Sequence, residues 1–204
     1  MYTVELVTSE AQKSEVFRQR YRIYVEEMGR HQVHADHVRR EIREPMDEQG
    51  AIFAAYTGNE LLGSLRVNLA RDGALECPEL YDFDQFGSAF PDKVSLLTKL
   101  MVERNHRSTV VFNLLAISAY EYGLRSGITH NFINCNDHLV RSFERLGHRT
   151  YKGKVSHPEY GNVTPMVCIV HDREYMEQMR SPLLRTLDMF LQKAAQTQLS
   201  RDAV

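Results

Sequence analysis

Three basic side chains lie in a short turn between an apolar segment and an expected helix. The segment 94–103 is apolar enough for a central strand, and the helix after the turn is expected to end near Gly127. The turn holds three basic residues, followed by two residue types typical of helix N-caps: Arg104, His106, Arg107, Ser108 and Thr109. Because a helix N-terminus has unpaired N–H groups and a partial positive charge, this turn predicts a binding site for an anion.

Two further groups of reactive residue types have simpler explanations. His31, His34 and His37 are spaced so that they could meet on one helix face and bind a metal ion. No Cys or His at a metal-binding spacing accompanies them, so we expect a polar loop and no metal site. Cys135 could form an acyl-enzyme. No histidine stands beside it to activate the thiol, and a small strand residue is the favoured interpretation.

The composition limits the class of protein. A chain of 204 residues, 43% of them hydrophobic, fits a single domain spanning residues 1–204. A formal net charge of −2 argues against a strongly basic nucleic-acid-binding protein. No apolar run approaches the roughly 20 residues of a membrane span, the first residues do not resemble a secretion signal, and the three cysteines form no paired pattern. We therefore expect a cytoplasmic protein without a membrane span or a nucleic-acid partner.

Hydrophobic spacing and turn residues predict the elements that carry these side chains. We expect strands at 2–8, 51–57, 61–70, 94–103, 128–136, 148–156 and 162–171. We expect a first helix from Ser9 or Ser14 to about Gly29 and a second from the basic turn to residue 126. Further helices are expected over 137–146 and over 173–195, the last with a break at Pro182. Residues 30–46, which are polar, are expected to form a short helix or a mobile loop, and residues 71–92 are expected to form a loop. This order predicts an α/β (α+β) fold, a mixed sheet with helices on both sides, and a helical extension at 173–204.

The order of elements resembles the GNAT acyltransferase superfamily over nearly the whole chain. The segment from Asn136 through Phe143-Glu-Arg-Leu-Gly147 to His148 is similar to the "N…YeklGF" signature of that superfamily. The resemblance implies a mostly antiparallel central sheet in which strands 94–103 and 128–136 splay apart. The pantetheine arm of an acyl donor would lie in the gap, and N–H groups after strand 94–103 would hold the donor's phosphate.

Two positions depart from the pattern of an acetyl-CoA-dependent enzyme. Val110 and Phe112 stand where such enzymes have glycines, which let the backbone approach a pyrophosphate. Phe143 replaces the tyrosine that often serves as the general acid, and a phenylalanine cannot donate a proton. An ordinary CoA-dependent acetyltransferase is therefore disfavoured.

A narrower branch fits better, namely the autoinducer (acyl-homoserine-lactone) synthases and the related N-acyl amino acid synthases, which take the acyl group from acyl carrier protein. In this chain, Arg20 to Tyr24 resembles their Arg-x-x-x-Phe element, and Glu44 to Asp47 resembles their acidic-x-x-Asp pair. Arg66 matches the arginine of their third strand, and Thr98-Lys-Leu-Met-Val102 resembles their Ser-Arg-Phe-Phe-Val strand. Arg30 and Leu96 stand where autoinducer synthases carry Trp and Glu. These differences favour an amino acid, rather than S-adenosylmethionine, as the acceptor.

The resemblance implies roles for the acidic pair and the arginines. The acceptor amine must lose a proton, and Asp47 and Glu44 are the candidate bases, unless they pair with nearby arginines. Arg20 and Arg66 suit the carboxylate of an amino acid, or they hold Asp47 in an internal ion-pair network. Tyr24 could pack on the acceptor or fill the apolar face of its helix.

The strand 94–103 and the basic turn would hold the donor. In this fold a backbone N–H on a bulged strand polarises the thioester carbonyl, here at Leu100, Met101 or Val102. Thr98 and Lys99 would flank the reacting centre or else face solvent. The phosphate and an acidic carrier protein would contact the turn, unless it is only a solvated face: Arg104, His106, Arg107 and Ser108.

The function predicted from the sequence is transfer of a fatty acyl group from acyl carrier protein to an amino acid or similar amine. The co-substrate would be acyl-phosphopantetheine or acyl-CoA, with no tightly bound cofactor. The alternatives are a conventional acyl-CoA-dependent N-acyltransferase and a catalytically silent GNAT-like module that binds an acyl group or a carrier protein.

Overall fold

The computed structural model describes residues 1–73, 75–107 and 110–202, and side chains up to residue 197. Ser108 and Thr109, predicted to cap a helix, lie outside the described residues. Within the described chain, no helix has the length and apolar character needed to cross a membrane.

A mixed sheet organises the molecule, as the sequence predicts. In the described residues its eight strands are β1 (Tyr2–Leu6), β4 (Ala51–Thr57), β5 (Glu60–Leu69), β6 (Val94–Val102), β7 (His130–Cys135), β10 (Gly161–Ile169) and β8 (His148–Thr150) in spatial order, with β9 (Val155–His157) paired to β10. The β6–β7 pair is parallel and the other paired strands are antiparallel. A separate pair joins β2 (Ala35–Asp36) and β3 (Glu41–Ile42).

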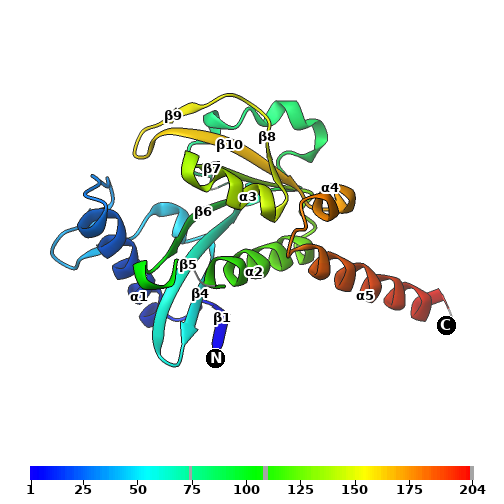
Figure 1. Cartoon of the computed structure of the whole chain (residues 1–204), viewed down its shortest axis with the longest axis horizontal. Helices are drawn as coiled ribbons and strands as arrows, with labels where there is room; N and C mark the ends of the chain where they lie inside the picture. The colour runs from blue at the N-terminus through cyan, green and yellow to red at the C-terminus, as the bar shows by residue number, and fades with distance from the viewer. Residues whose placement is uncertain (74, 108–109, 203–204) are drawn as a thin grey trace.

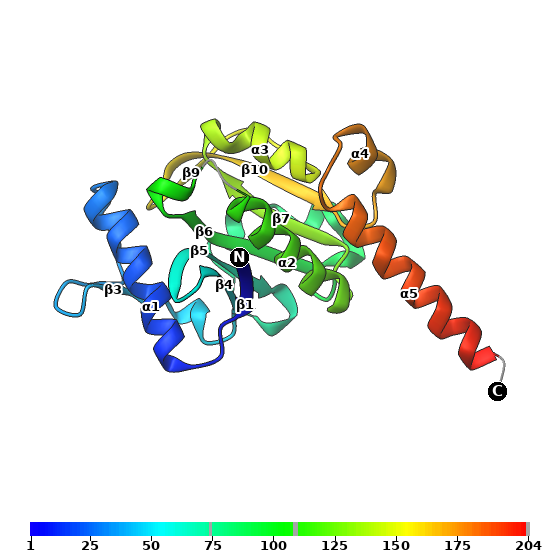
Figure 2. The same cartoon turned by 60° about the horizontal axis from the view of Figure 1, so that its bottom comes forward.

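Helices cover both faces of this sheet (Figures 1 and 2). Side chains alternate along β4, so that Ile52 packs with Phe17 of helix α1 (Glu10–Tyr21), whereas Phe53 shares a cluster with Leu115 of helix α2 (Val111–Arg125). The predicted arrangement with helices on both sides is therefore confirmed.

Helix α1 begins at Ser9, the first of the two predicted starts. The Ser9 hydroxyl accepts the backbone N–H of Gln12 at 3.2 Å, and the Gln12 side chain accepts the N–H of Ser9, which forms a capping box. The helix continues as the π-helical segment η1 (Arg22–Glu27). Gly29 then adopts a φ of +63°, a region that favours glycine, and ends the helix where predicted.

The segment between β5 and β6 lacks regular structure but packs well. It contains the short 3-10 turns η3 (Ala70–Asp72), η4 (Pro78–Leu80) and η5 (Phe83–Ala89). Tyr81 and Phe83 stack at 5.3 Å between ring centroids, and Phe83 meets Phe132 of β7 edge-on at 5.1 Å. These aromatic contacts fix the segment that carries Glu76 against the sheet.

The remaining elements follow the predicted order with adjusted bounds. Three further 3-10 turns and three helices complete the part of the chain that the structure describes: η2 (Pro45–Asp47), η6 (Arg104–His106), η7 (Asp137–Leu139), α3 (Val140–Leu146), α4 (Arg173–Gln178) and α5 (Leu184–Asp202). The strand expected over 148–156 is instead two short strands, β8 and β9. The break at Pro182 falls between α4 and α5, and α5 extends away from the body of the molecule in both views (Figures 1 and 2).

Candidate active site

The parallel pair β6–β7 separates after a short paired stretch. Its register joins Val94–Leu96 with His130–Phe132, and no pairing continues beyond Leu96 in the described strands. A cavity of about 420 Å³ is lined by the diverging residues of both strands, 97–102 of β6 and 133–135 of β7. This volume lies within the range of small-molecule sites, about 300–1,000 Å³. The predicted splay is therefore present, and it contains a cavity.

The cavity has both apolar and polar walls. Apolar side chains come from the two strands and from α2, η7 and α3: Leu97, Leu100, Met101, Phe112, Ile133, Leu139 and Phe143. Polar and charged side chains come from segments far apart in the sequence: Tyr24, Arg30, Glu76, Lys99, Arg107, His157 and Tyr160. Such a mixture suits a ligand with a hydrophobic tail and a polar reacting group.

Strand β6 bulges at this cavity. Thr98 pairs with Arg66 and Met101 with Ser64, so two residues of β6, Lys99 and Leu100, oppose one residue of β5. Lys99 has a φ of +53°, which costs a non-glycine residue on the order of 1–3 kcal/mol. A bulge leaves its extra residue unpaired in the ladder. Backbone N–H groups in this stretch are therefore suited to polarising a carbonyl group.

Arg66 is the hub of a buried ion network beside the cavity. Its Nη1 donates to Glu44 Oε2 at 2.8 Å and to Asp47 Oδ1 at 3.0 Å, its Nη2 to Glu76 Oε2 at 3.0 Å, and its Nε to Thr98 Oγ1 at 3.0 Å. The Arg66 side chain has no exposed surface. Its guanidinium is thus occupied by the protein's own carboxylates.

Arg20 is buried in the same network. Its Nη1 donates to both carboxylate oxygens of Asp47, at 2.9 and 2.7 Å, and its side chain has no exposed surface. Asp47 Oδ2 also accepts the backbone N–H of Glu44 at 2.7 Å. Of the two roles considered for Arg20 and Arg66, the geometry supports the second, in which they hold Asp47.

Both acidic residues of the pair are held ionised. Burial would raise the pKa of Asp47, but Arg20 and Arg66 outweigh it and lower that pKa below its ordinary value. Burial likewise opposes ionisation of Glu44, whose pKa is nevertheless lowered by Lys99 and Arg66. Neither side chain lines the cavity, so this geometry suits them to positioning the network.

Lys99 connects the network to the cavity. Its Nζ lies 2.6 Å from Glu44 Oε1 and 3.1 Å from Glu76 Oε1, and it donates a hydrogen bond to the hydroxyl of Tyr160. Burial would lower the pKa of Lys99, but Glu76, Tyr24 and Glu44 raise it above its ordinary value. Lys99 is therefore a fixed ammonium at the bulge.

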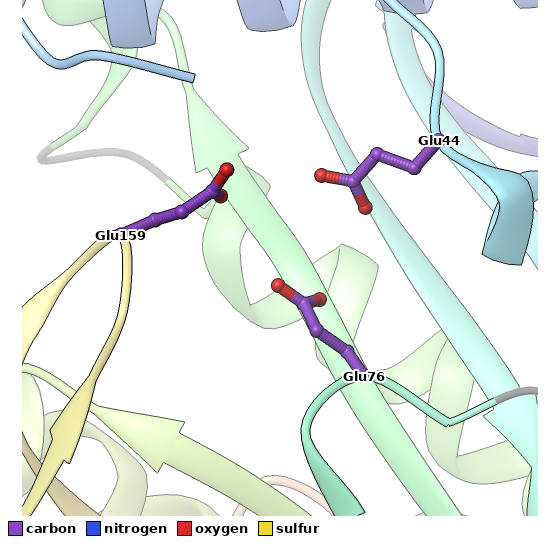
Figure 3. A group of neighbouring side chains, drawn as sticks. All are labelled: Glu44, Glu76 and Glu159. Atoms are coloured by element: carbon purple, nitrogen blue, oxygen red, sulfur yellow. The ribbon is translucent and has the colours of Figure 1, made fainter. Parts of the chain in front are cut away.

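Three carboxylates converge at this point. Glu44, Glu76 and Glu159 come from three separate segments and point toward one another, with ligand oxygens within 4.8 Å (Figure 3). The ammonium of Lys99 contacts two of these groups, and Glu159 accepts the backbone N–H of Val33 at 3.0 Å. The cluster thus already holds a cation supplied by the protein.

His157 faces the same cluster in its neutral form. Burial lowers the pKa of His157 below its ordinary value. Its Nδ1 accepts the backbone N–H of Glu159 at 3.2 Å, so the neutral ring carries its proton on Nε2, which lies 3.7 Å from Glu76 Oε1. The ring also stacks on Tyr160 at 4.4 Å. Glu76, His157 and Tyr160 escaped sequence reasoning because they lie in segments without a periodic pattern.

The residues predicted for the donor fall on two surfaces. Arg107 lines the cavity, where its Nε donates to the Val102 carbonyl at 3.0 Å and its Nη1 to Glu27 at 2.6 Å. Arg104 and His106 line a neighbouring hollow of about 480 Å³, and Arg104 lies 3.6 Å from Glu27. Ser108 lies outside the described residues, so its predicted role stays a prediction.

Cys135 lines the cavity as a protonated thiol. Burial raises the pKa of Cys135 to about 12, and its Sγ donates to the carbonyl of Asn136 at 3.2 Å. A thiolate nucleophile is therefore disfavoured at neutral pH. The geometry supports the interpretation of Cys135 as a small strand residue.

The position of Arg66 depends on Gly50. A Cβ on residue 50 would lie 2.8 Å from both Cγ and Cδ of Arg66 and 2.9 Å from the Met46 carbonyl. We expect Gly50→Ala to destabilise the protein by about 1–3 kcal/mol in urea unfolding, because the buried guanidinium cannot shift without losing its partners. Gly153→Ala is the control, since no described atom lies within 4 Å of its added Cβ. Equal unfolding free energies for the two variants would contradict this account.

A parallel, splayed strand pair inside an otherwise antiparallel sheet, with a bulged strand lining the cavity between them, defines a GNAT-fold acyltransferase. The family model for the N-acyl amino acid synthase FeeM matches residues 15–172, and the chain belongs to this family. It is an N-acyltransferase enzyme of the branch that the sequence resembles. No curated protein matches the chain.

Solved structures share this fold at low sequence identity. FeeM, an N-acyl amino acid synthase from uncultured soil microbes, superposes with a TM-score of 0.71 at 12% identity, covering 91% of this chain and 98% of FeeM. MesI, a CoA-dependent acyl-homoserine lactone synthase, has a TM-score of 0.62 at 20% identity, covering 91% and 95%. A putative N-acetyltransferase from Lactobacillus plantarum has a TM-score of 0.62 at 19% identity, covering 83% and 98%.

Proposed function

We propose that the enzyme transfers a fatty acyl group from acyl carrier protein to the amine of an amino acid. The observation that carries this proposal is the cavity in the β6–β7 splay, which joins apolar walls to a charged cluster at a β-bulge. The apolar walls suit an acyl chain. The bulge next to them suits the thioester, and the charged cluster suits a zwitterionic acceptor.

The proposed reaction joins the amine nitrogen to the thioester carbonyl carbon and releases the pantetheine thiol. Backbone N–H groups of 100–102 would stabilise the negative charge that develops on the carbonyl oxygen. Lys99, a fixed ammonium beside them, adds positive charge. A thiol has an ordinary pKa near 8.5 and leaves readily as a thiolate, which is compatible with Phe143 at the general-acid position.

The amine nucleophile must first lose a proton, which passes to a base. Among the described residues that line the cavity, Glu76 is the one with a carboxylate side chain. Arg66 and Lys99 fix the orientation of this carboxylate. We assign Glu76 as the base that accepts the proton of the amine. Glu44 and Asp47, the candidate bases of the sequence, would position Lys99 and Arg66.

Two features favour a carrier protein as the donor. Val110 and Phe112, at the start of α2, stand at the positions where glycines would admit a pyrophosphate. The turn also presents the largely exposed side chain of Arg104 beside Arg107, which suits an acidic partner. Acyl-CoA is the rival donor, because MesI, which has a similar fold, is a CoA-dependent synthase.

Turnover measurements test the proposal directly. The enzyme is incubated with acyl carrier protein or CoA carrying the same acyl chain, together with all twenty amino acids, and N-acyl products are identified by mass spectrometry. Products from the carrier protein at a higher kcat/KM support the proposal. Products from acyl-CoA alone would assign the other donor, and no product from either would refute the proposed function.

Arg107→Glu is expected to raise the KM for acyl carrier protein about tenfold or more, with the acceptor KM changed less than about twofold. Reversing one charge at a protein–protein contact is expected to cost roughly 1.4 kcal/mol or more of binding free energy, and 1.4 kcal/mol corresponds to a tenfold change in affinity. Arg125→Glu, at the C-terminal end of α2, is the matched control and should leave both KM values unchanged. Equal effects of Arg107→Glu on donor and acceptor would contradict the placement of the phosphate.

A further inference from the structure

An amino-acid acceptor brings a carboxylate that needs a cation in the site. Arg20 and Arg66, which the sequence suggested for this role, have no exposed surface and are bound by Asp47, Glu44 and Glu76. Neither guanidinium lines the cavity, and Arg66 cannot receive a ligand without releasing a buried carboxylate, which is costly. The cation for the acceptor must therefore come from the cavity wall.

Three cationic side chains line the cavity, and they differ in their partners within the described chain. Lys99 contacts Glu44 and Glu76, and Arg107 contacts Glu27. Arg30 pairs with no carboxylate of the described residues, and its guanidinium lies over two aromatic rings. Of the three, Arg30 is the cation whose hydrogen-bonding capacity is left for a ligand.

Aromatic rings orient the Arg30 guanidinium. Its Cζ lies 5.3 Å from the ring centroid of Tyr160 and 6.0 Å from that of Tyr24, distances at which cation–π attraction acts. The two rings lie 5.7 Å apart, and Lys99 fixes the Tyr160 hydroxyl. A guanidinium stacked on rings keeps its N–H edge available for a bidentate carboxylate.

The local backbone delivers Arg30 to these rings. The positive φ of Gly29 reverses the chain after η1, and the backbone N–H of Arg30 donates to the Tyr24 carbonyl at 2.9 Å. This bond ties the start of the Arg30 side chain to the residue whose ring it covers. The guanidinium is thus positioned by the helix end rather than by a mobile loop.

We propose that Arg30 binds the α-carboxylate of the acceptor and thereby selects amino acids over simple amines. This inference rests on the proposed function. The acceptor would place its carboxylate at Arg30 and its amine at Glu76, with the Tyr24 and Tyr160 rings beside it. Arg30 is then a specificity-determining residue, and the reaction with an amine lacking the carboxylate does not require it.

The test compares each amino acid with its decarboxylated amine, for example leucine with 3-methylbutylamine and phenylalanine with phenethylamine. Wild-type enzyme should prefer the amino acid in kcat/KM by about 10- to 100-fold, the range of a charge-assisted hydrogen-bonded pair. Arg30→Met should remove that preference by slowing the amino acid alone. Arg30→Lys should restore part of it, and the exposed control Arg39→Met should keep the wild-type ratio.

A ratio that Arg30→Met leaves unchanged, or an equal loss with amine and amino acid, would overturn the assignment. Binding calorimetry gives a second measurement that does not require turnover. Wild type should bind N-dodecanoylleucine at least about tenfold more tightly than the amide of dodecanoic acid with 3-methylbutylamine, and Arg30→Met should bind both alike. Failure of all acyl transfer would refute the proposed function, whereas the two affinities decide on Arg30 by themselves.

Discussion

Arg66→Met is expected to lower the free energy of unfolding by about 3–5 kcal/mol, the loss seen when one partner of a buried ion pair is removed. Arg66 contacts Glu44, Asp47 and Glu76 at 2.8–3.0 Å, and its own side chain has no exposed surface. Methionine keeps much of the aliphatic stem, so the main loss is electrostatic. For a chain of this size the melting temperature should fall by about 6–20 °C.

The matched control is Arg18→Met. The Arg18 side chain is largely exposed and lies 3.2 Å from Glu41, so its loss should cost less than about 1 kcal/mol. Urea unfolding followed by circular dichroism at pH 7 measures both variants. A loss below 1 kcal/mol for Arg66→Met would contradict the role of Arg66 as the hub of the network.

Acidification separates charge from packing in this variant. In the wild type the pKa values of Glu44 and Asp47 are lowered, so their pairing stabilises the fold above the ordinary carboxyl pKa and is lost as the pH falls through the lowered values. In Arg66→Met the same buried carboxylates lack their partner and gain from protonation. The stability difference between the two proteins should therefore shrink between pH 7 and pH 4, whereas a packing defect would persist.

Local patterns and family resemblance together predicted the framework of the site. The start of helix α1 at Ser9 and the hairpin up to Leu69 follow from short-range signals in the sequence, whereas the splay of β6 from β7 was implied by the resemblance. The resemblance then identified the acidic pair and the two arginines of the network. It left open whether Arg20 and Arg66 bind a ligand or the protein's own carboxylates, because that depends on which side chains fill the space around each guanidinium.

The rest of the site depends on contacts between distant segments. Glu76 reaches Lys99 across 23 residues and Tyr160 reaches it across 61, from a loop and a hairpin whose positions are set by aromatic packing and strand register. The positive φ of Lys99 has no signature in the sequence, because lysine does not favour it. Arg30 appeared in the sequence as a departure from a tryptophan, without any sign of the rings that orient it.

The charge balance of the buried ion network around Arg66 explains why Glu76 is the proposed base. Arg20, Arg66 and Lys99 supply three positive charges, and Glu44, Asp47 and Glu76 supply three negative ones. Glu44 and Asp47 are buried, whereas Glu76 lines the cavity. Of the three carboxylates in this balanced network, Glu76 is therefore the one that an acceptor ammonium can approach from the cavity.

Glu76→Gln is expected to lower kcat by about 10²- to 10⁴-fold, the range that a positioned general base contributes. The amide retains the shape of the side chain and can still accept a hydrogen bond from Arg66, so the protein should remain folded in circular dichroism. The KM for the acyl donor should change little, because Glu76 is proposed to act on the amine. Glu79→Gln, an exposed residue on the next turn, is the matched control and should retain wild-type kcat.

The pH dependence of Glu76→Gln separates proton transfer from a structural effect. The α-amine of a free amino acid is mostly protonated at pH 7, so raising the pH towards 9 supplies more neutral amine without help from a base. The activity of Glu76→Gln should therefore rise more steeply than that of the wild type between pH 7 and pH 9. Two results would rule out Glu76 as the acceptor of the proton: a kcat of Glu76→Gln within about threefold of wild type, or a loss of kcat that is the same at pH 7 and pH 9. The second result would count because alkaline pH relieves the defect of a missing base.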